Sequence, residues 1–187
     1  MSQARHALFD SIAGVENIEQ LCSKLDIGEL SDRLVEQDVI SREELNTVLN
    51  DLEVPADEMN TSLVADTLVR TGRISVYQLW ATVSGQQQKL TIGEYTVVEP
   101  IGAGGMGEVL LALHRRMRRK VAVKFLPAHF ADDQEMIKRF EREVEVAAQL
   151  SHPNIVTAYD AGHTGDTHYL VMEYVDGCDL RSLVRAS

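Results

Sequence analysis

Two neighbouring stretches decide the fold: Ile101-Gly102-Ala103-Gly104-Gly105-Met106-Gly107-Glu108-Val109 and, further on, Val121-Ala122-Val123-Lys124. Glycine has no Cβ, so Gly102, Gly104 and Gly107 let backbone N–H groups approach phosphate oxygens and let the chain adopt positive φ values. Together the two stretches have the composition of a phosphate-binding loop with its lysine. A glycine hairpin without a ligand is the alternative, and the flanking residues distinguish between the two.

The residues on both sides of the glycines predict strands. Tyr95–Glu99 is rich in β-branched residues and Val109–Leu113 is apolar, so the glycines join two strands of a hairpin. A dinucleotide-binding fold would instead place a helix after the glycines and an acidic residue about 20 positions on, to bind a ribose hydroxyl. The chain has Val121–Lys124 in that neighbourhood, which argues against a dinucleotide-binding fold.

The order of glycine loop, strand and lysine resembles the amino-terminal lobe of the protein kinases, and Gly-Ala-Gly-Gly-Met-Gly resembles the bacterial Ser/Thr kinases of the eukaryotic-like (Hanks) type. The resemblance implies an α+β fold with a five-stranded antiparallel sheet and one long helix. It also implies that residues 101–109 and Ala122 contact ATP, and that Lys124 binds the α and β phosphates while it pairs with a glutamate on the helix. For Lys124, a solvated strand end is the alternative.

A long helix is predicted after the lysine, beginning with the capping sequence Asp132–Glu135. Its apolar residues recur at helical spacing on one stripe: Met136, Ile137, Phe140, Val144 and Ala147. At about 100° per residue, Glu143 lies roughly 60° from Phe140 at the border of this stripe, whereas Glu145 lies roughly 140° away, toward solvent. Glu143 is therefore the predicted partner of Lys124, and its context also matches the family position; a surface carboxylate is the alternative.

Two further strands are predicted at Ile155–Tyr159 and His168–Met172, separated by a turn at Gly162–Asp166. The stretch that follows, Met172-Glu173-Tyr174-Val175-Asp176-Gly177, resembles the connection between the two kinase lobes. The resemblance implies that Met172 is the gatekeeper of the adenine pocket and that the backbone of Glu173 and Val175 meets adenine. It further implies that Asp179 binds the ribose.

The sequence contains neither a His-Arg-Asp catalytic loop nor an Asp-Phe-Gly segment, which supply the base and hold magnesium in the family. The resemblance implies ATP and Mg²⁺ as cofactors, but the magnesium ligands are absent from these 187 residues. We therefore expect no phosphoryl transfer by this chain alone and interpret it as part of a longer Ser/Thr kinase that acts on protein substrates. The alternatives are a kinase-like scaffold or regulatory protein that works through its helical region, and a module that binds nucleotide for stability.

Residues 1–84 are predicted to form a separate helical domain, joined by a linker at 85–92 to the kinase-like lobe at 93–187. The helical region contains an internal repeat with an offset of 34 residues, in which Leu34, Ile40, Ser41 and Leu45 recur as Leu68, Ile74, Ser75 and Leu79. Each copy predicts two helices, the second starting with a capping box, at Ser41–Glu44 and Ser75–Gln78. Two copies without the tetratricopeptide aromatic and proline signature favour a compact bundle over a solenoid. We expect Tyr77 and Trp80 in its core.

Acidity is concentrated in the first half of the chain. Residues 1–90 hold 7 of the 18 Lys and Arg residues and 15 of the 29 Asp and Glu residues. Their net charge is therefore 7 − 15 = −8, which is most of the −11 of the whole chain. This balance argues against nucleic-acid binding. Because the chain has no long apolar run and its two cysteines lack a ligand spacing, we expect a cytoplasmic protein with no membrane span here, although an anchor further along a longer protein stays open. A protein partner of the helical region is a further expectation.

Overall fold

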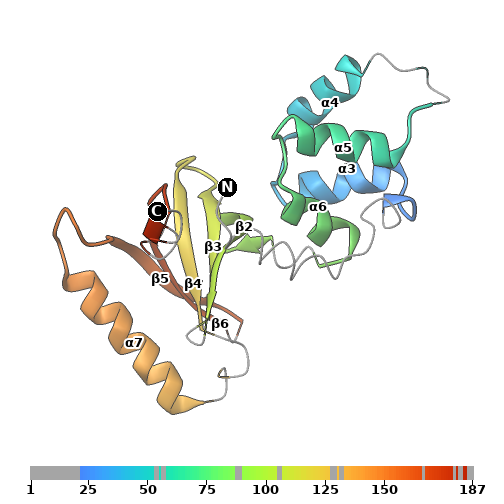
Figure 1. Cartoon of the computed structure of the whole chain (residues 1–187). Coiled ribbons are helices and arrows are strands. Elements are labelled where there is room, and N and C mark those ends of the chain that lie inside the picture. Colours follow the sequence, from blue (N-terminus) through green and yellow to red (C-terminus); the bar gives the residue numbers. More distant parts are fainter. Residues whose placement is uncertain are drawn as a thin grey trace. The chain divides into compact units, whose positions relative to one another are not determined.

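The structure is a computed structural model that describes residues 22–52, 55, 58–86, 90–104, 107–126, 130, 133–165, 167–178, 180 and 183–184. These residues form two compact units, a first unit within residues 13–99 and a second unit within residues 100–187. The first unit holds four labelled helices, and the second holds most of a β-sheet and one long helix (Figure 1). Strand β2 (Tyr95–Gly104) runs without a break from the first unit into the second.

The four helices described in the first unit each begin at a polar N-cap residue. They are α3 (Ile27–Glu36), α4 (Arg42–Asp51), α5 (Thr61–Arg70) and α6 (Val76–Val83). Asp26, Ser41, Asn60 and Ser75 accept hydrogen bonds from backbone N–H groups of the first turn, which would otherwise have no partner within the helix. Both predicted capping boxes are present, at Ser41 with Glu44 and at Ser75 with Gln78.

The two copies of the repeat end their first helices in the same way. In α3 the N–H of Val39 donates to the carbonyl of Leu34, and in α5 the N–H of Arg73 donates to the carbonyl of Leu68. The residue before each donor has a positive φ, 52° at Asp38 and 69° at Gly72, as this helix-ending motif requires. Helix α6 ends likewise, with Gln86 donating to Ala81 after a Gly85 with φ of 74°.

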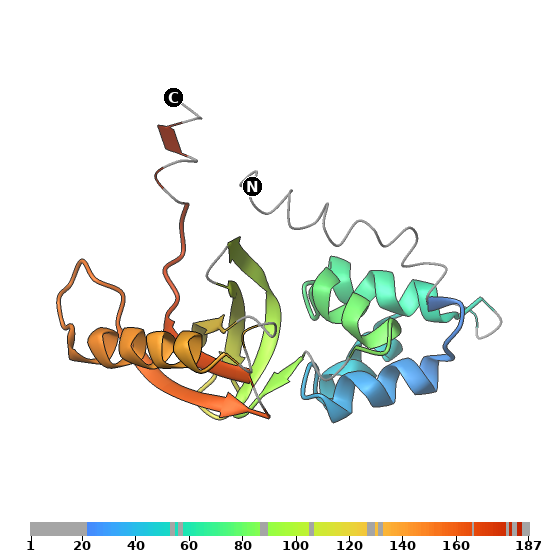
Figure 2. The same ribbon diagram turned by 90° about the horizontal axis from the view of Figure 1, so that it is seen from below.

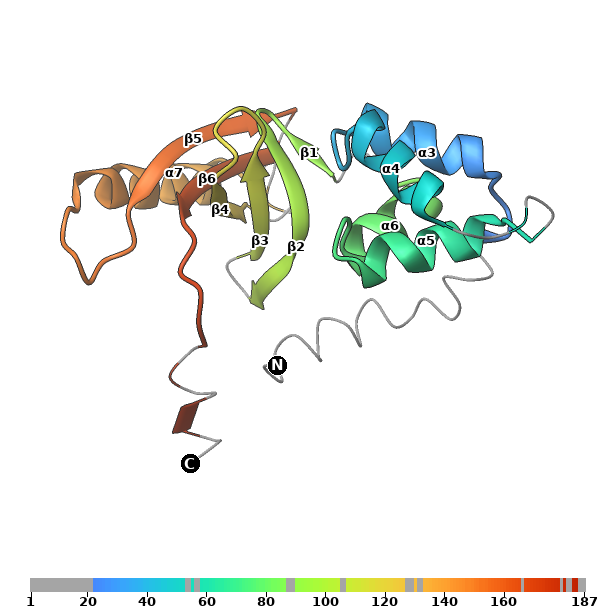
Figure 3. The same ribbon diagram turned by 90° about the horizontal axis from the view of Figure 1, so that it is seen from above.

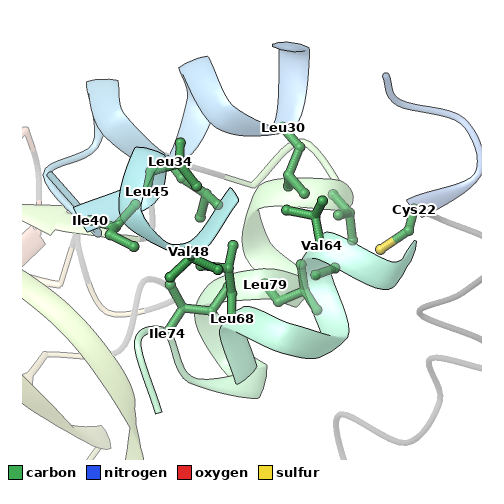
Figure 4. Close-up of a cluster of buried hydrophobic side chains, with 12 residues drawn as sticks. Cys22, Leu30, Leu34, Ile40, Leu45, Val48, Val64, Leu68, Ile74 and Leu79 are labelled. Atoms are coloured by element: carbon green, nitrogen blue, oxygen red, sulfur yellow. The ribbon is translucent and has the colours of Figure 1, made fainter. Parts of the chain in front are cut away.

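The core of the helical bundle is built symmetrically from the two copies (Figure 4). Three equivalent pairs lie in one buried cluster: Leu34 and Leu68, Ile40 and Ile74, and Leu45 and Leu79. The predicted compact bundle is therefore confirmed, and equivalent residues of the two copies contribute to its core. Tyr77 is buried as expected, whereas Trp80, 5.6 Å from it between ring centroids, is half-buried.

The sheet has six strands in the order β1-β2-β3-β4-β6-β5, and the registers of β1 with β2, β3 with β4, β4 with β6 and β5 with β6 are antiparallel. Besides β2, the strands are β1 (Thr91–Ile92), β3 (Gly107–His114), β4 (Lys120–Phe125), β5 (Ala158–Thr164) and β6 (Thr167–Glu173). The α+β fold is as predicted, but a sixth strand is added to the expected five. Strand β1 exists because Gly93, with φ of 52°, closes a tight turn back onto β2 (Figure 3).

Helix α7 (Gln134–Gln149) lies against the sheet (Figure 2), where Phe140 packs with Leu126 and Leu170. Its N-cap is Asp133, which accepts from the N–H groups of Glu135 (3.0 Å) and Met136 (3.2 Å). The expected cap, Asp132, lies outside the described residues. Of two adjacent aspartates, a local pattern cannot tell which one precedes the first helical turn.

The last hairpin differs from the prediction. Strand β5 begins at Ala158 rather than Ile155, and Gly162 lies inside this strand, opposite Tyr169, rather than in the turn. A Cβ on Gly162 would lie 2.8 Å from Tyr169 Oη, so the tyrosine ring occupies the space above this glycine. The turn comes later, at Gly165 with φ of 56°.

None of the helices in the described part of the chain has both the length and the apolar composition of a membrane span.

Candidate nucleotide-binding site

An ion pair joins the sheet to helix α7. Lys124 Nζ lies 2.5 Å from Glu143 Oε1, and the exposed fractions of the two side chains are 15% and 48%. Lys124 is near the end of β4, and Glu143 lies one helical turn beyond the buried Phe140. The packing of Phe140 thus sets the rotation of α7 that presents Glu143 to the lysine.

Strand register lines up the predicted phosphate and adenine residues on one face of the sheet. Val109 in β3 pairs with Lys124 in β4, and Ala122 pairs with Met172 in β6. Directly paired residues of antiparallel strands point to the same side, and so do residues two apart on one strand. Val109, Ala122, Lys124 and Met172 therefore share a face.

The glycine stretch forms the end of the hairpin between β2 and β3. Strand β2 extends to Gly104, further than the predicted Glu99, and β3 starts at Gly107. Gly107 has φ of 117°, a conformation that disfavours a Cβ, and a Cβ on Gly102 would meet only Val109, at 3.7 Å. Ile101, Ala103 and Glu108 lie on these strands, whereas Gly105 and Met106 lie outside the described residues.

The predicted hinge begins at the end of β6. Met172 and Glu173 are its half-buried last residues, and Val175 beyond them is 64% exposed. The N–H of Glu173 donates to the carbonyl of Thr157 (2.8 Å), so a contact of this residue with adenine has to use its carbonyl. Asp179 lies outside the described residues.

One contact at the hinge has no signal in the sequence. The side chain of Glu173 accepts a hydrogen bond from the N–H of Thr157 (3.3 Å), in addition to the backbone bond between the same two residues. This double connection holds the end of β6 to the segment before β5. The two residues are 16 positions apart, and the hinge motif that contains Glu173 does not include Thr157, so no local pattern indicates the pairing.

The described residues contain no group of His, Cys, Asp or Glu side chains that could hold a metal ion. In the turn between β3 and β4, Arg119 stacks on the ring of Tyr159, 3.8 Å from its centroid, so its guanidinium is held against the sheet.

The arrangement of glycine hairpin, lysine, helix glutamate and hinge is that of a protein kinase amino-terminal lobe, and a family comparison agrees. Residues 95–187 match the protein kinase domain family. This part of the chain belongs to that family, as the amino-terminal lobe region of a bacterial Hanks-type Ser/Thr kinase, preceded by a helical segment.

Individual relatives are bacterial Ser/Thr kinases. The chain is 45% identical over 95 residues to serine/threonine-protein kinase PrkC of Bacillus subtilis, a match that covers 51% of this chain and 15% of the relative. It is 48% identical over 94 residues to PknB of Mycobacterium leprae, covering 48% of this chain and 15% of that protein. A crystal structure of the Mycobacterium tuberculosis PknI kinase domain, a double mutant, is 40% identical with a TM-score of 0.46, covering 52% and 38% of the two chains. This chain thus spans a small part of the length of the curated relatives it matches.

Proposed function

We propose that residues 93–187 bind ATP, with Mg²⁺, as the amino-terminal lobe of a Ser/Thr protein kinase. The observation that carries the proposal is the ion pair between Lys124 and Glu143, on the sheet face that also holds Val109 and Ala122. In kinases such a lysine binds the α and β phosphates only while a glutamate on the neighbouring helix orients it. The pair and the glycine hairpin are both present in this chain.

The described residues fit ATP by charge and by space. Lys124 supplies a half-buried positive charge, and Glu143 limits the positions that this charge can take. Gly102 and Gly107 leave room for the backbone to close on phosphate oxygens, and Ala122 and Met172 line the same face at the hinge side. ATP would supply the transferable γ-phosphoryl group, and these residues would hold its triphosphate and its adenine.

The complete protein, on this proposal, transfers phosphate from ATP to hydroxyl groups of protein substrates in the cytoplasm. The 187 residues contain no catalytic-loop base and no magnesium ligand of the family type, so this chain alone binds nucleotide without transfer. Residues 1–84 form a distinct domain, connected through residues 85–92, that is available to a protein partner.

A kinase-like scaffold that works through its helical region is the second candidate. The observation in its favour is that the described helices of the bundle share a buried apolar core. A scaffold of this kind would fold and bind a partner without needing Lys124.

Calorimetry with Mg·ATP tests the nucleotide site. Lys124→Ala should weaken binding at least 10-fold because a charge-assisted contact to phosphate is lost. Lys120→Ala is the matched control, since Lys120 lies on the same strand but is exposed. The affinity of this variant for Mg·ATP should stay within two-fold of that of the wild type. Equal affinities of the two variants, with both folded by circular dichroism, would overturn the assignment.

A second pair of variants tests the glutamate. Glu143→Gln should weaken Mg·ATP binding several-fold because the lysine loses its orienting charge, whereas Glu145→Gln, on the exposed side of α7, should have no effect. In the complete enzyme, Lys124→Ala should abolish phosphoryl transfer and leave the helical bundle folded. Retained transfer would contradict the role of Lys124.

A further inference from the structure

The two capping boxes of the repeat differ in one side chain, and the difference changes what they contact. In α4 the box closes on itself: Ser41 Oγ donates to Glu44 Oε2 (2.7 Å), which also accepts from the N–H of Ser41 (3.2 Å). In α6 the residue equivalent to Glu44 is Gln78, whose side chain carries an NH₂ donor as well as an acceptor oxygen.

Gln78 uses both ends of its amide. Its Oε1 accepts from the N–H of Ser75 (2.8 Å), as a capping box requires, while its Nε2 donates to the carbonyl of Val97 in β2 (2.8 Å). Ser75 Oγ, in turn, donates to the carbonyl of Val98. The start of α6 is thus bonded to two consecutive residues of β2, and these two residues belong to the first unit together with α6.

The bonds reach the part of β2 just beyond its described ladder with β1. Strand β1 pairs with Tyr95 and Thr96, and Val97 lies beyond that ladder. There the N–H of Val97 donates to the carbonyl of Leu90, and its carbonyl accepts from Gln78. The helical bundle thus supplies a hydrogen-bond donor to a backbone carbonyl of this strand.

The contact is dry. Val97 and Leu90 are 0% exposed and Gln78 is 6% exposed. Thr82, also fully buried, donates to the carbonyl of Gln78, and its own carbonyl accepts from Arg33. Breaking a buried hydrogen bond of this kind costs free energy because the polar group that remains cannot bond to water instead.

We infer that Ser75 and Gln78 are positioning residues for the glycine loop. Strand β2 continues from Val97 and Val98 to Gly104 and therefore carries Gly102 at its far part. Fixing two carbonyls near its start limits how the strand can shift, and the glycine hairpin extends from it. The role in nucleotide binding rests on the proposed function, whereas the restraint on β2 does not.

The repeat itself supplies the test, because each copy can be converted into the other. Gln78→Glu keeps an acceptor for the N–H of Ser75 but, at pH 8, has no proton to donate to Val97. Hydrogen exchange without nucleotide should become at least 10-fold faster along β2, including residues 99–104 beyond the contact. The control Glu44→Gln makes the reverse exchange in the exposed box of α4 and should leave β2 within two-fold of the wild type.

A second pair of variants keeps the test valid if the Gln78→Glu variant fails to fold. Ser75→Ala removes an N-cap and the bond to Val98, whereas Ser41→Ala removes an N-cap alone. Faster exchange in β2 for Ser75→Ala, and not for Ser41→Ala, supports the restraint. Equal exchange in the two variants, or acceleration confined to Val97 and Val98, would overturn it.

Mg·ATP affinity is the second readout. Gln78→Glu should weaken binding at least three-fold and Glu44→Gln should not; unchanged affinity with faster exchange would overturn the positioning role. If the wild-type chain binds no Mg·ATP, the proposed function fails instead, and hydrogen exchange at residues 99–104 then decides the restraint by itself.

Discussion

The helices of the two units of the molecule bury apolar side chains to different extents. The helical bundle encloses a large cluster that both repeat copies fill, and several of its side chains, such as Leu30, Leu34, Val64 and Leu68, are 0% exposed. In the second unit, α7 has one buried residue, Phe140, and it joins a small cluster with Leu126 and Leu170.

The large apolar side chains that are exposed among the described residues all belong to the second unit. They are Met117, Val146, Leu150, Ile155, Val156, Tyr159, Val175, Leu180, Leu183 and Val184. Surface of this kind is typical of a region that packs against further protein. The comparison teaches that the described helices bury their large apolar side chains within the bundle, whereas the kinase-like unit fits the proposal of a lobe within a larger enzyme.

A pair of leucine truncations gives the largest expected contrast. Leu68→Ala, at 0% exposure in the bundle, should cost about 3 kcal/mol of unfolding free energy because it removes buried area and leaves a cavity. Leu150→Ala, at 45% exposure after α7, should cost less than about 0.5 kcal/mol. Urea unfolding followed by the fluorescence of Trp80, the chain's one tryptophan, reports the first change, and hydrogen exchange in α7 reports the second. Similar losses of unfolding free energy in the two variants would contradict the contrast between the two units.

Gly162→Ala tests the tightest packing of the second unit. The new Cβ would lie 2.8 and 2.9 Å from Oη and Cζ of the Tyr169 ring, so we expect a cost of about 2 kcal/mol. Thermal unfolding by circular dichroism measures it, with Gly102→Ala as the control because its nearest side chain is 3.7 Å away. The cost should shrink in a Tyr169→Leu background. An undiminished cost there would exclude the ring as its cause.

The smallest expected effect is a pH dependence from the same tyrosine. Burial, with a smaller contribution from the charge of Asp160, raises the pKa of Tyr169 above its usual 10.0. Above pH 10 the unfolded chain therefore loses this proton before the folded chain does, so stability is full below pH 10 and falls as the pH rises further. Tyr169→Phe should flatten the stability of the second unit between pH 9 and 11. An equal slope in the variant would assign the loss to other groups.

Much of the site could be predicted because its signals are local. The glycine loop, the lysine that ends an apolar strand and the phase of Glu143 on its helix each depend on a few consecutive residues or on helical periodicity. The same holds for the capping boxes of Ser41 and Ser75, which the structure contains as predicted. The nucleotide roles assigned to these residues stay predictions until binding is measured.

The predictions that were wrong concern the last hairpin and the first strand. Gly162 has the composition of a turn, but the ring of Tyr169 places it in a strand, and Ile155–Thr157 has the composition of a strand but precedes β5. At Gly162 a contact between strands overrode a local preference, whereas the N–H of Ile155 donates to the carbonyl of His152 in a local turn. The short strand β1 was missed because two residues are too few for a periodic pattern.

By itself the sequence determined the kinase-like lobe, the repeat that fills the helical core, and the pairing candidates Lys124 and Glu143. Tertiary structure alone decided which side chains serve a second purpose: Gln78 bonded to Val97, and Glu173 held to Thr157. The physical reason is distance along the chain. A cap or a helical stripe depends on neighbours within a turn, whereas these bonds join residues 19 and 16 positions apart, which only the packed fold brings together.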